Sequence, residues 1–443
     1  MGDAMDRWDA VVVGGGILGT SVGYWLGARY DGRIAVLERE KQVAVHTSHR
    51  NTGVIHRPFY LHPVKRRVFA RAAQLSYGLW KRYAAEKHLP FTEVGTYEIA
   101  LDDDGVATLE TYASWSLKNG MAPGEVELLD AREVRRREPN VTCAGAILSK
   151  TDSAVDYRAF TEALRSDAEA LGVKFLTLAS VREIRAYGEE LEILVDNASE
   201  PIVARYLVNC AGGGAVDIAH AMGVALGYTD LHFRGEYWVV DGRVAGLSHR
   251  NIYAVPRHKE LPFLDPHWIV RADGRREIGP NAVPVPSPWA YDGLFRPIRP
   301  WFEKLLEPPI ENKVRLLLNP EFVNLAAGEM LSSLSKAEML GRVQRFLPAL
   351  KASHLVARGT AGIRSNVVDR RGEMAREAIE IPAPHSYHIL NYNSPGATGA
   401  PAYAAYLVDG LAKRGDLDHL RKNPKPQRVW AWETIAAGMG LAG

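Results

Sequence analysis

The feature that most constrains the fold is a glycine-rich turn near the N-terminus. A β-branched run, Val11 to Val13, leads into three consecutive glycines, and Gly19 completes the pattern Gly-x-Gly-x-x-Gly. In such a turn the first glycine permits the tight bend, the second lets the backbone approach a pyrophosphate, and the third lets the helix pack on the strand. We therefore expect a Rossmann-type dinucleotide-binding unit. Its predicted cofactor contacts are Gly14, Gly16, Ile17, Leu18 and Gly19.

The same stretch allows one alternative, a membrane-spanning helix. Ala10 to Ala28 carries no charge, and its glycines recur at every fourth residue from Gly15 to Gly27, as in packed transmembrane dimers. Three adjacent glycines would weaken a spanning helix, whereas a strand, a turn and a helix use all of these residue types. We favour the strand, turn and helix.

An acidic residue follows at the spacing typical of a nucleotide-binding unit. Asp31-Gly32 predicts a turn, and Arg33 to Glu38 predicts an apolar strand that ends in a carboxylate about twenty residues beyond Gly19. This carboxylate would accept hydrogen bonds from both ribose hydroxyls; the alternative is a surface glutamate at a strand end. We predict that Glu38 and the adjacent Arg39 contact the cofactor.

A second glycine-rich segment favours FAD over NAD as the cofactor. Ala204 to Ala211 predicts a strand that runs into Gly212 to Gly214, similar to the second dinucleotide contact of flavoproteins. An ordinary helix cap is the alternative. We include Val181, Ala211 and Gly212 among the predicted cofactor contacts.

A third loop lies near the C-terminus. His388 to Asn391 predicts a strand, and Ala400 to Leu411 has a helical pattern. A helix that begins near Gly396 would point its positive end at the pyrimidine edge of a reduced flavin, although a helix cap is again the alternative. The predicted contacts in this loop are Ser394, Pro395, Gly396, Ala397 and Thr398.

Several uncommon strings occur in a fixed order along the chain. They are His46 to His56, Arg137 to Asn140, Phe233 to Tyr237, Ile278 to Val283, Ala361 to Arg364 and Ser394 to Thr398. In these strings the chain resembles the FAD-dependent family of D-amino acid oxidase and glycerol-3-phosphate dehydrogenase. Within that family it is most similar to the L-2-hydroxyglutarate dehydrogenases (oxidases), from Val11 to about Leu411.

The resemblance implies an α/β fold in which a mostly antiparallel substrate domain with helices is inserted into a Rossmann-type FAD domain. We predict that the FAD domain consists of residues 1–90, 143–225 and 355–415, and the substrate domain of residues 91–142 and 226–354. Residues 416–443 would form a C-terminal tail. The Pro-rich stretches Pro280 to Pro288 and Pro297 to Pro309 are predicted as long loops.

The resemblance also implies which residues lie at the flavin. Residues Asn51, Gly53, Val54 and His56 would run past the ring, and Arg364 would hold a substrate carboxylate. Thr52 is also predicted to contact the cofactor. The chain departs from the family pattern next to these residues. It has Arg57 to Tyr60 where a small residue, glycine and an aromatic pair are usual, Tyr392-Asn393 where Ala-Pro is usual, and His49 in place of glycine.

These residues favour oxidation of a small 2-hydroxy acid, with L-2-hydroxyglutarate to 2-oxoglutarate as the leading candidate, by hydride transfer from Cα to flavin N5. We predict His56 as the base, Arg364 as a planar fork for the carboxylate, and Tyr60 as a hydrogen-bond donor. The alternatives are a histidine that bonds the flavin or caps the strand, an ion pair between Arg364 and Asp369, and a tyrosine that only packs.

A dicarboxylate needs a second cation, and Arg57, Arg234 and Arg271 are all available. Of these, Arg57 adjoins His56, but we expect it to be an ordinary surface arginine. Two other functions stay open, an amine or amino acid oxidase and a flavin-binding protein without turnover. The electron acceptor would be oxygen, a quinone or a soluble carrier.

The bulk composition limits the partners. The net charge of +2 gives no reason to expect a nucleic acid, and the basic run from Arg132 to Arg137 is predicted as a solvated helix face. Cys143 and Cys210 lack disulfide or metal-ligand spacing, so no metal is expected. An acidic N-terminus unlike a signal peptide predicts a cytoplasmic protein. The basic, aromatic tail from Lys422 could contact the inner face of a membrane but more often packs on its own protein.

Overall fold

A computed structural model describes residues 7–256, 265–293, 298–422, 425 and 429–441. Several sequence predictions fall outside these residues: the acidic N-terminus up to Asp6, Pro297, and Pro424, Pro426 and Arg428 of the tail.

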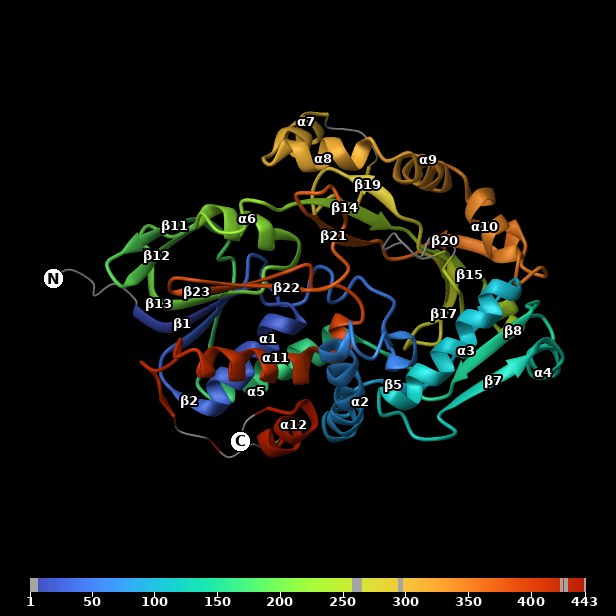
Figure 1. Cartoon of the computed structure of the whole chain (residues 1–443), viewed down its shortest axis with the longest axis horizontal. Coiled ribbons are helices and arrows are strands. Elements are labelled where there is room, and N and C mark those ends of the chain that lie inside the picture. The colour runs from blue at the N-terminus through green and yellow to red at the C-terminus, as the bar shows by residue number, and fades with distance from the viewer. Residues whose placement is uncertain (1–6, 257–264, 294–297, 423–424, 426–428, 442–443) are drawn as a thin grey trace.

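The first large sheet contains the glycine turn. Its central strand β1 pairs in parallel with β3 on one side and with β13 on the other. Helices α1, α5 and α11 cover one face of this sheet (Figure 1). The strands are β1 Arg7–Val13, β3 Ile34–Leu37, β10 Lys174–Leu176, β11 Val181–Tyr187, β12 Glu190–Val195, β13 Ile202–Asn209, β22 Ile379–Ala383 and β23 Ser386–Leu390.

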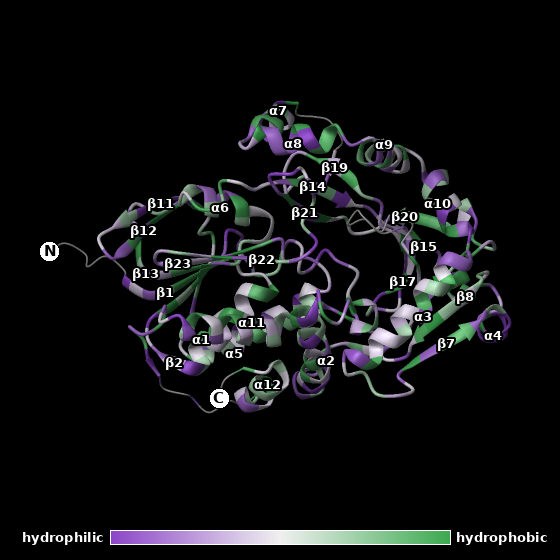
Figure 2. Ribbon diagram, viewed as in Figure 1, coloured by the Kyte–Doolittle hydropathy of each residue, from purple (hydrophilic) through white to green (hydrophobic). Residues whose placement is uncertain are grey.

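The uncharged stretch from Ala10 to Ala28 is divided between β1 and α1 (Ile17–Arg29), so the membrane-helix alternative is wrong. Among the described residues no helix is long and apolar enough to cross a membrane. Figure 2 shows the middle of this sheet largely in hydrophobic green, as expected for parallel strands that are covered by helices. At Gly23 a Cβ would lie 2.8 Å from the side chain of Val36, so α1 packs closely on β3.

The second large sheet is mostly antiparallel, with one parallel pair, β6 with β16. Its strands are β6 Thr96–Ala100, β7 Val126–Asp130, β8 Gly145–Ser149, β15 Trp238–Val240, β16 Asn251–Ala254, β17 His267–Val270, β18 Arg276–Gly279 and β20 Leu355–Arg358. The Rossmann-type sheet and the antiparallel sheet confirm the predicted fold class. The division at residues 90, 142, 225, 354 and 415 stays a prediction.

Three small sheets complete the architecture. One has the order β19-β14-β21, one the order β4-β9-β5, and one joins β2 to β24. Their strands are β2 Tyr30–Asp31, β4 Val54–Ile55, β5 Phe91–Glu93, β9 Ser153–Val155, β14 Thr229–Gly235, β19 Val283–Val285, β21 Gly362–Val368 and β24 Arg421–Lys422.

The helices outside the first layer surround the two large sheets, and α7 to α10 run along the outer edge in Figure 1. Together with α5 and α11 of the first layer, the helices that follow α1 are α2 Arg67–Lys87, α3 Asp103–Lys118, α4 Ala131–Arg137, α5 Tyr157–Ala170, α6 Ala215–Ala221, α7 Arg299–Leu306, α8 Ile310–Leu317, α9 Pro320–Leu334, α10 Lys336–Gln344, α11 Gly396–Lys413 and α12 Trp432–Met439.

The Pro-rich stretches are not simply long loops, which corrects the prediction. Pro284 lies within β19, an edge strand, where a residue without an N–H group is tolerated. Pro300 lies in the first turn of α7, where its missing N–H costs no helical hydrogen bond.

The described part of the C-terminal tail packs against the first layer of helices. Trp430 is buried, and its ring lies 5.3 Å from Tyr24, 5.4 Å from Trp80 and 6.1 Å from Trp25. Trp432 in α12 also packs on Trp25, at 5.3 Å. The tail therefore completes the core beneath α1 and α2.

Replacing this indole should destabilise the protein. We expect Trp430→Ala to lower the free energy of unfolding by about 3–5 kcal/mol, because the truncation leaves a cavity in a packed aromatic core. Denaturant unfolding measures the change. Val64→Ala is the control, since Val64 is 76% exposed and should change stability by about 0.5 kcal/mol at most. Equal effects of the two changes would contradict the role assigned to the tail.

Candidate active site

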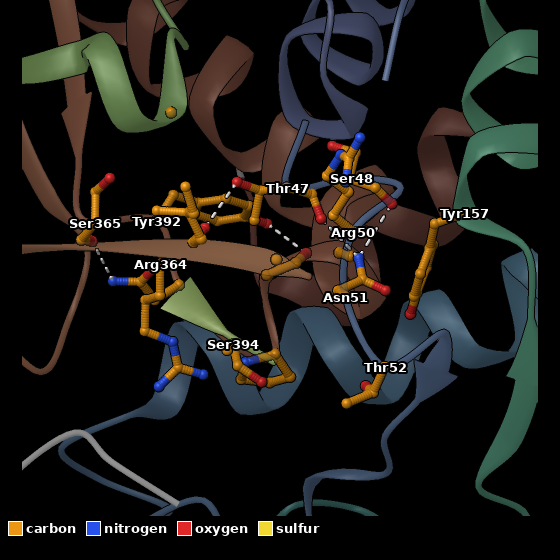
Figure 3. A pocket seen from close by; sticks show the side chains of 18 of the residues that line it. Thr47, Ser48, Arg50, Asn51, Thr52, Tyr157, Arg364, Ser365, Tyr392 and Ser394 are labelled. Atoms are coloured by element: carbon orange, nitrogen blue, oxygen red, sulfur yellow. Dashed lines mark hydrogen bonds between the residues drawn. The ribbon is translucent and has the colours of Figure 1, made fainter. Parts of the chain in front are cut away.

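One cavity collects residues from distant segments of the chain. These include the glycine turn, the loop from Thr47 to His56, the second glycine loop, β21, and the loop from Ile389 to Thr398. Figure 3 shows Arg364 and Ser394 on one side of this pocket and Thr52 and Tyr157 on the other. Predicted site residues in the wall are Gly16, Ile17, Leu18, Asn51, Thr52, Val54, His56, Gly212, Arg364, Ser394, Pro395, Gly396, Ala397 and Thr398.

The other predicted residues lie outside the wall that the described chain forms around this cavity. They are Gly14, Gly19, Glu38, Arg39, Gly53, Tyr60, Val181 and Ala211. Tyr60 lines an adjoining chamber, and Val181 begins β11.

The glycine turn has the geometry that a dinucleotide requires. Gly14 has a φ of +108°, which side chains rarely adopt, and a Cβ at Gly19 would lie 1.9 Å from the carbonyl oxygen of Gly14. Helix α1 has no side-chain cap at Gly16 and no acidic residue in its first turn. The hydroxyl of Ser48 accepts one of the free N–H groups, that of Ile17 (2.9 Å), and the positive end of the helix faces the cavity, where an anion such as a pyrophosphate can bind.

Glu38 follows β3 beside this turn. Its carboxylate accepts hydrogen bonds from the N–H groups of Gly15 (2.9 Å) and Glu40 (2.8 Å), and burial raises its pKa. The guanidinium of Arg39 stacks over the ring of Trp289 at 4.0 Å. The backbone bonds hold the Glu38 carboxylate at the end of the strand where the ribose contact is predicted.

Thr398 links the loop from Ile389 to Thr398, where flavin contacts are predicted, to the loop from Thr47 to His56. Its hydroxyl accepts a hydrogen bond from the backbone N–H of His56 (3.1 Å) and lies 3.0 Å from the hydroxyl of Tyr157. Its carbonyl accepts a bond from the indole N–H of Trp80 (3.0 Å). Because α11 begins at Gly396 without a side-chain cap, its positive end is also directed at this cavity.

His56 is held by a carboxylate that the sequence did not reveal. Its Nδ1 lies 3.1 Å from Oδ2 of Asp152, and Asp152 is fully buried. The other carboxylate oxygen accepts bonds from the hydroxyl of Ser149 (2.5 Å) and the N–H of Arg57 (3.2 Å). The carboxylate therefore has a fixed orientation, and it favours the histidine tautomer with its proton on Nδ1.

The pairing of β4 with β9 brings His56 and Asp152 together. Val54 is opposite Ala154 and Ile55 is opposite Ser153, so the next position in the register places His56 opposite Asp152. Both strands are only two or three residues long and carry no motif. In the sequence Asp152 is only a lone acid just before an apolar strand. Its partnership with His56 becomes evident only once the pairing register of β4 and β9 is known.

Arg364 projects from β21 toward both the main cavity and the adjoining chamber. Burial lowers its pKa. The alternative partner suggested by the sequence, Asp369, instead pairs with Arg371 at 3.2 Å. The guanidinium therefore lies where a carboxylate in either space could reach it.

Aromatic residues enclose His56, and the sequence singled out Tyr60 among them but not Tyr253. Its ring makes edge contacts with Tyr60 at 6.3 Å and Tyr253 at 5.4 Å. Tyr253 also stacks on His267 at 3.9 Å, and burial lowers the pKa of His267 to about 3, so this imidazole is neutral near pH 7. Burial raises the pKa of Tyr60 far above its usual value, so its hydroxyl stays protonated as a hydrogen-bond donor.

The three candidate arginines for a distal carboxylate are all engaged by glutamates. Arg234 pairs with Glu236 at 2.8 Å and Arg271 with Glu277 at 2.5 Å. The expectation that Arg57 lies on the surface is wrong. Its side chain is 1% exposed, because it bonds to Glu125 at 2.9 Å and to Gln74 at 2.9 Å beneath α2.

The fold and the cavity define a class of protein. The family model for FAD dependent oxidoreductases matches residues 9–410, and the chain belongs to that family. The glycine cradle and the N-termini of α1 and α11, neither of which has an acidic residue in its first turn, fit its cofactor, FAD. The protein is therefore an FAD-dependent oxidoreductase.

The chain is also similar to individual enzymes of known name within the family. An L-2-hydroxyglutarate dehydrogenase of Salmonella houtenae is 31% identical over 403 residues, which cover 90% of this chain and 92% of that protein. The human mitochondrial L-2-hydroxyglutarate dehydrogenase is 28% identical, over 93% of this chain and 90% of that protein.

Solved structures agree with the fold. An L-α-glycerophosphate oxidase of Mycoplasma pneumoniae with bound FAD has a TM-score of 0.70 at 20% identity and covers 95% of this chain and 97% of its own. A glycine oxidase of Geobacillus kaustophilus has a TM-score of 0.67 at 18% identity, over 92% of this chain and 95% of its own.

The glycine cradle yields a prediction about FAD. We expect Gly19→Ala to weaken FAD binding about ten- to hundred-fold, because the added methyl group collides with the backbone of Gly14. Titration of the apoprotein with FAD, followed by flavin fluorescence, gives the affinity. Gly78→Ala in α2 is the matched control, since a Cβ there meets nothing within 4 Å. Unchanged affinity in a folded Gly19→Ala variant would contradict the predicted pyrophosphate site.

Proposed function

We propose that the protein oxidises small L-2-hydroxy acids, L-2-hydroxyglutarate among them, to the corresponding 2-oxo acids. The observation that carries this proposal is that the paired His56 and Asp152 share one cavity with Arg364 and with the predicted flavin contacts. The names of the relatives supply the substrate, and the cavity supplies a base and a carboxylate-binding group.

The reaction needs a base for the proton of the substrate hydroxyl and a group that binds the substrate carboxylate, and the residues of the cavity suit both needs. With Nδ1 bonded to Asp152, Nε2 of His56 is the ring nitrogen that takes the proton of the substrate hydroxyl. Arg364 binds the carboxylate with its planar fork and so orients the Cα hydrogen. Bound FAD supplies the acceptor for the Cα hydride at N5.

Tyr60 has a supporting part. Its protonated hydroxyl lines the chamber next to His56 and Arg364, where it donates a hydrogen bond to the bound acid. The aromatic rings around His56 exclude water, and so strengthen the charge interactions on which proton removal depends.

Anaerobic reduction of the flavin tests the proposal. L-2-Hydroxyglutarate should bleach the bound flavin, and His56→Asn should slow this reduction about 10²- to 10⁴-fold, as expected for removal of a general base. Stopped-flow absorbance measures the rate. His249→Asn, at an exposed histidine, is the control and should leave the rate unchanged.

The other outcomes separate the competing functions. Bleaching by an amino acid but not by its hydroxy analogue would select an amino acid oxidase. A flavin that dithionite reduces but no small acid does would indicate a flavin-binding protein without turnover. Reoxidation by air, a quinone or a soluble carrier would then identify the electron acceptor, which we propose is one of these three.

The role of Arg364 has a separate signature. We expect Arg364→Lys to raise the Kd for the acid about ten- to hundred-fold, because an ammonium keeps the charge but not the two parallel hydrogen bonds. The dependence of the reduction rate on acid concentration gives this Kd. The exposed Arg371→Lys is the control. An unchanged Kd would show that the carboxylate binds elsewhere.

A further inference from the structure

A second chamber continues the active-site cavity beyond His56. The two share His56, Tyr253, Arg364, Asn393 and Ser394 in their walls, and the chamber has a volume of about 770 Å³. That volume falls in the range of about 300–1,000 Å³ that encloses drug-sized ligands. The chamber therefore has room for the side chain of a bound acid.

The near wall of the chamber is basic. Arg66, Arg364 and Arg376 line it, and Arg66 pairs with Glu377 at 2.7 Å. This wall adjoins the His56 end, where the proposed reaction needs a partner for the substrate carboxylate.

The wall formed by α3 and β6 is acidic instead of basic. One face of α3 lines it with residues at helical spacing: Asp104, Ala107, Thr108, Thr111, Tyr112 and Trp115. Strand β6 adds Thr96 and Glu98, which alternate with the core residues Tyr97 and Ile99. In α3 and β6, both of which the structure describes in full, no cationic side chain lines the chamber.

Glu98 is the group on this wall that most needs a ligand. Its carboxyl forms no hydrogen bond or ion pair with any described residue. Burial, with a smaller contribution from the charge of Asp152, raises its pKa to about 8. Glu98 is only partly buried and its side chain lines the chamber, so a hydrogen-bond donor or a cation on a ligand would stabilise the ionised form that burial now disfavours.

We propose that Glu98 binds a hydrogen-bond donor at the far end of the substrate side chain. The preferred substrates are then L-2-hydroxy acids that end in an amide or an ammonium group rather than in a second carboxylate. Their 2-carboxylate binds Arg364, and their far end reaches the wall of α3 and β6. Tyr112 and Trp115 line the same wall, and aromatic rings attract ammonium groups. This proposal rests on the proposed function and specifies its substrate class.

Three five-carbon probes that differ only in the end group test the proposal: L-2-hydroxyglutarate, its terminal amide, and L-5-amino-2-hydroxypentanoate. With the holoenzyme, the rate of flavin reduction at low acid concentration should be about ten- to hundred-fold higher for the amide or the amine than for the diacid. Glu98→Leu should abolish that preference and leave reduction by L-2-hydroxybutyrate, which has no polar end group, unchanged.

Two further variants complete the design. Glu98→Gln keeps the shape and an acceptor oxygen, so it should keep the preference for the amide and lose that for the amine. Glu110→Leu, an exposed acid on α3 outside the chamber wall, is the matched control and should keep both preferences.

The outcomes separate the two proposals. If the diacid is the best of the three probes and Glu98→Leu does not change their order, the role of Glu98 is overturned while the proposed function stands. If no 2-hydroxy acid reduces the flavin, the proposed function itself fails.

Discussion

The hydroxyl of Thr398 is the contact on which the active site most depends. It accepts a hydrogen bond from the backbone N–H of His56 and lies within hydrogen-bond distance of the hydroxyl of Tyr157. The carbonyl of the same residue accepts a hydrogen bond from the indole N–H of Trp80. The first turn of α11 is thereby tied to the loop of His56, to α5 and to α2. One residue thus sets the distance between the predicted flavin loop and the proposed base.

The sequence predicted those parts of the site that depend on local geometry. A glycine turn, a strand that ends in Glu38 and a helix that begins near Gly396 are each encoded by neighbouring residues, and the structure has all three. Asp152 was not predictable, because its partnership with His56 arises from the register of two short strands far apart in the chain. Arg57 was misjudged because the acid that accounts for its burial, Glu125, is equally remote.

The charges around the cavity follow a consistent pattern. Arginines that could have served a second carboxylate are instead neutralised by glutamates, as in the pairs of Arg234 with Glu236 and Arg271 with Glu277. These pairs keep isolated charges out of the buried walls, where an unpaired ion would be costly. They also leave few groups to recognise a substrate, which increases the importance of Arg364 and Glu98.

The packing of Trp430 against Trp25 has a consequence for the order of folding. The core of the first large sheet is closed by segments about four hundred residues apart. Strand β1 and helix α1 are synthesised long before α11 and the tail. During synthesis β1 and α1 keep apolar surface exposed until α11 and the tail are made. The residues of the antiparallel sheet are synthesised in the interval. The glycine turn and the first residues of α11 line one cavity, so we expect firm binding of FAD only once both have been made.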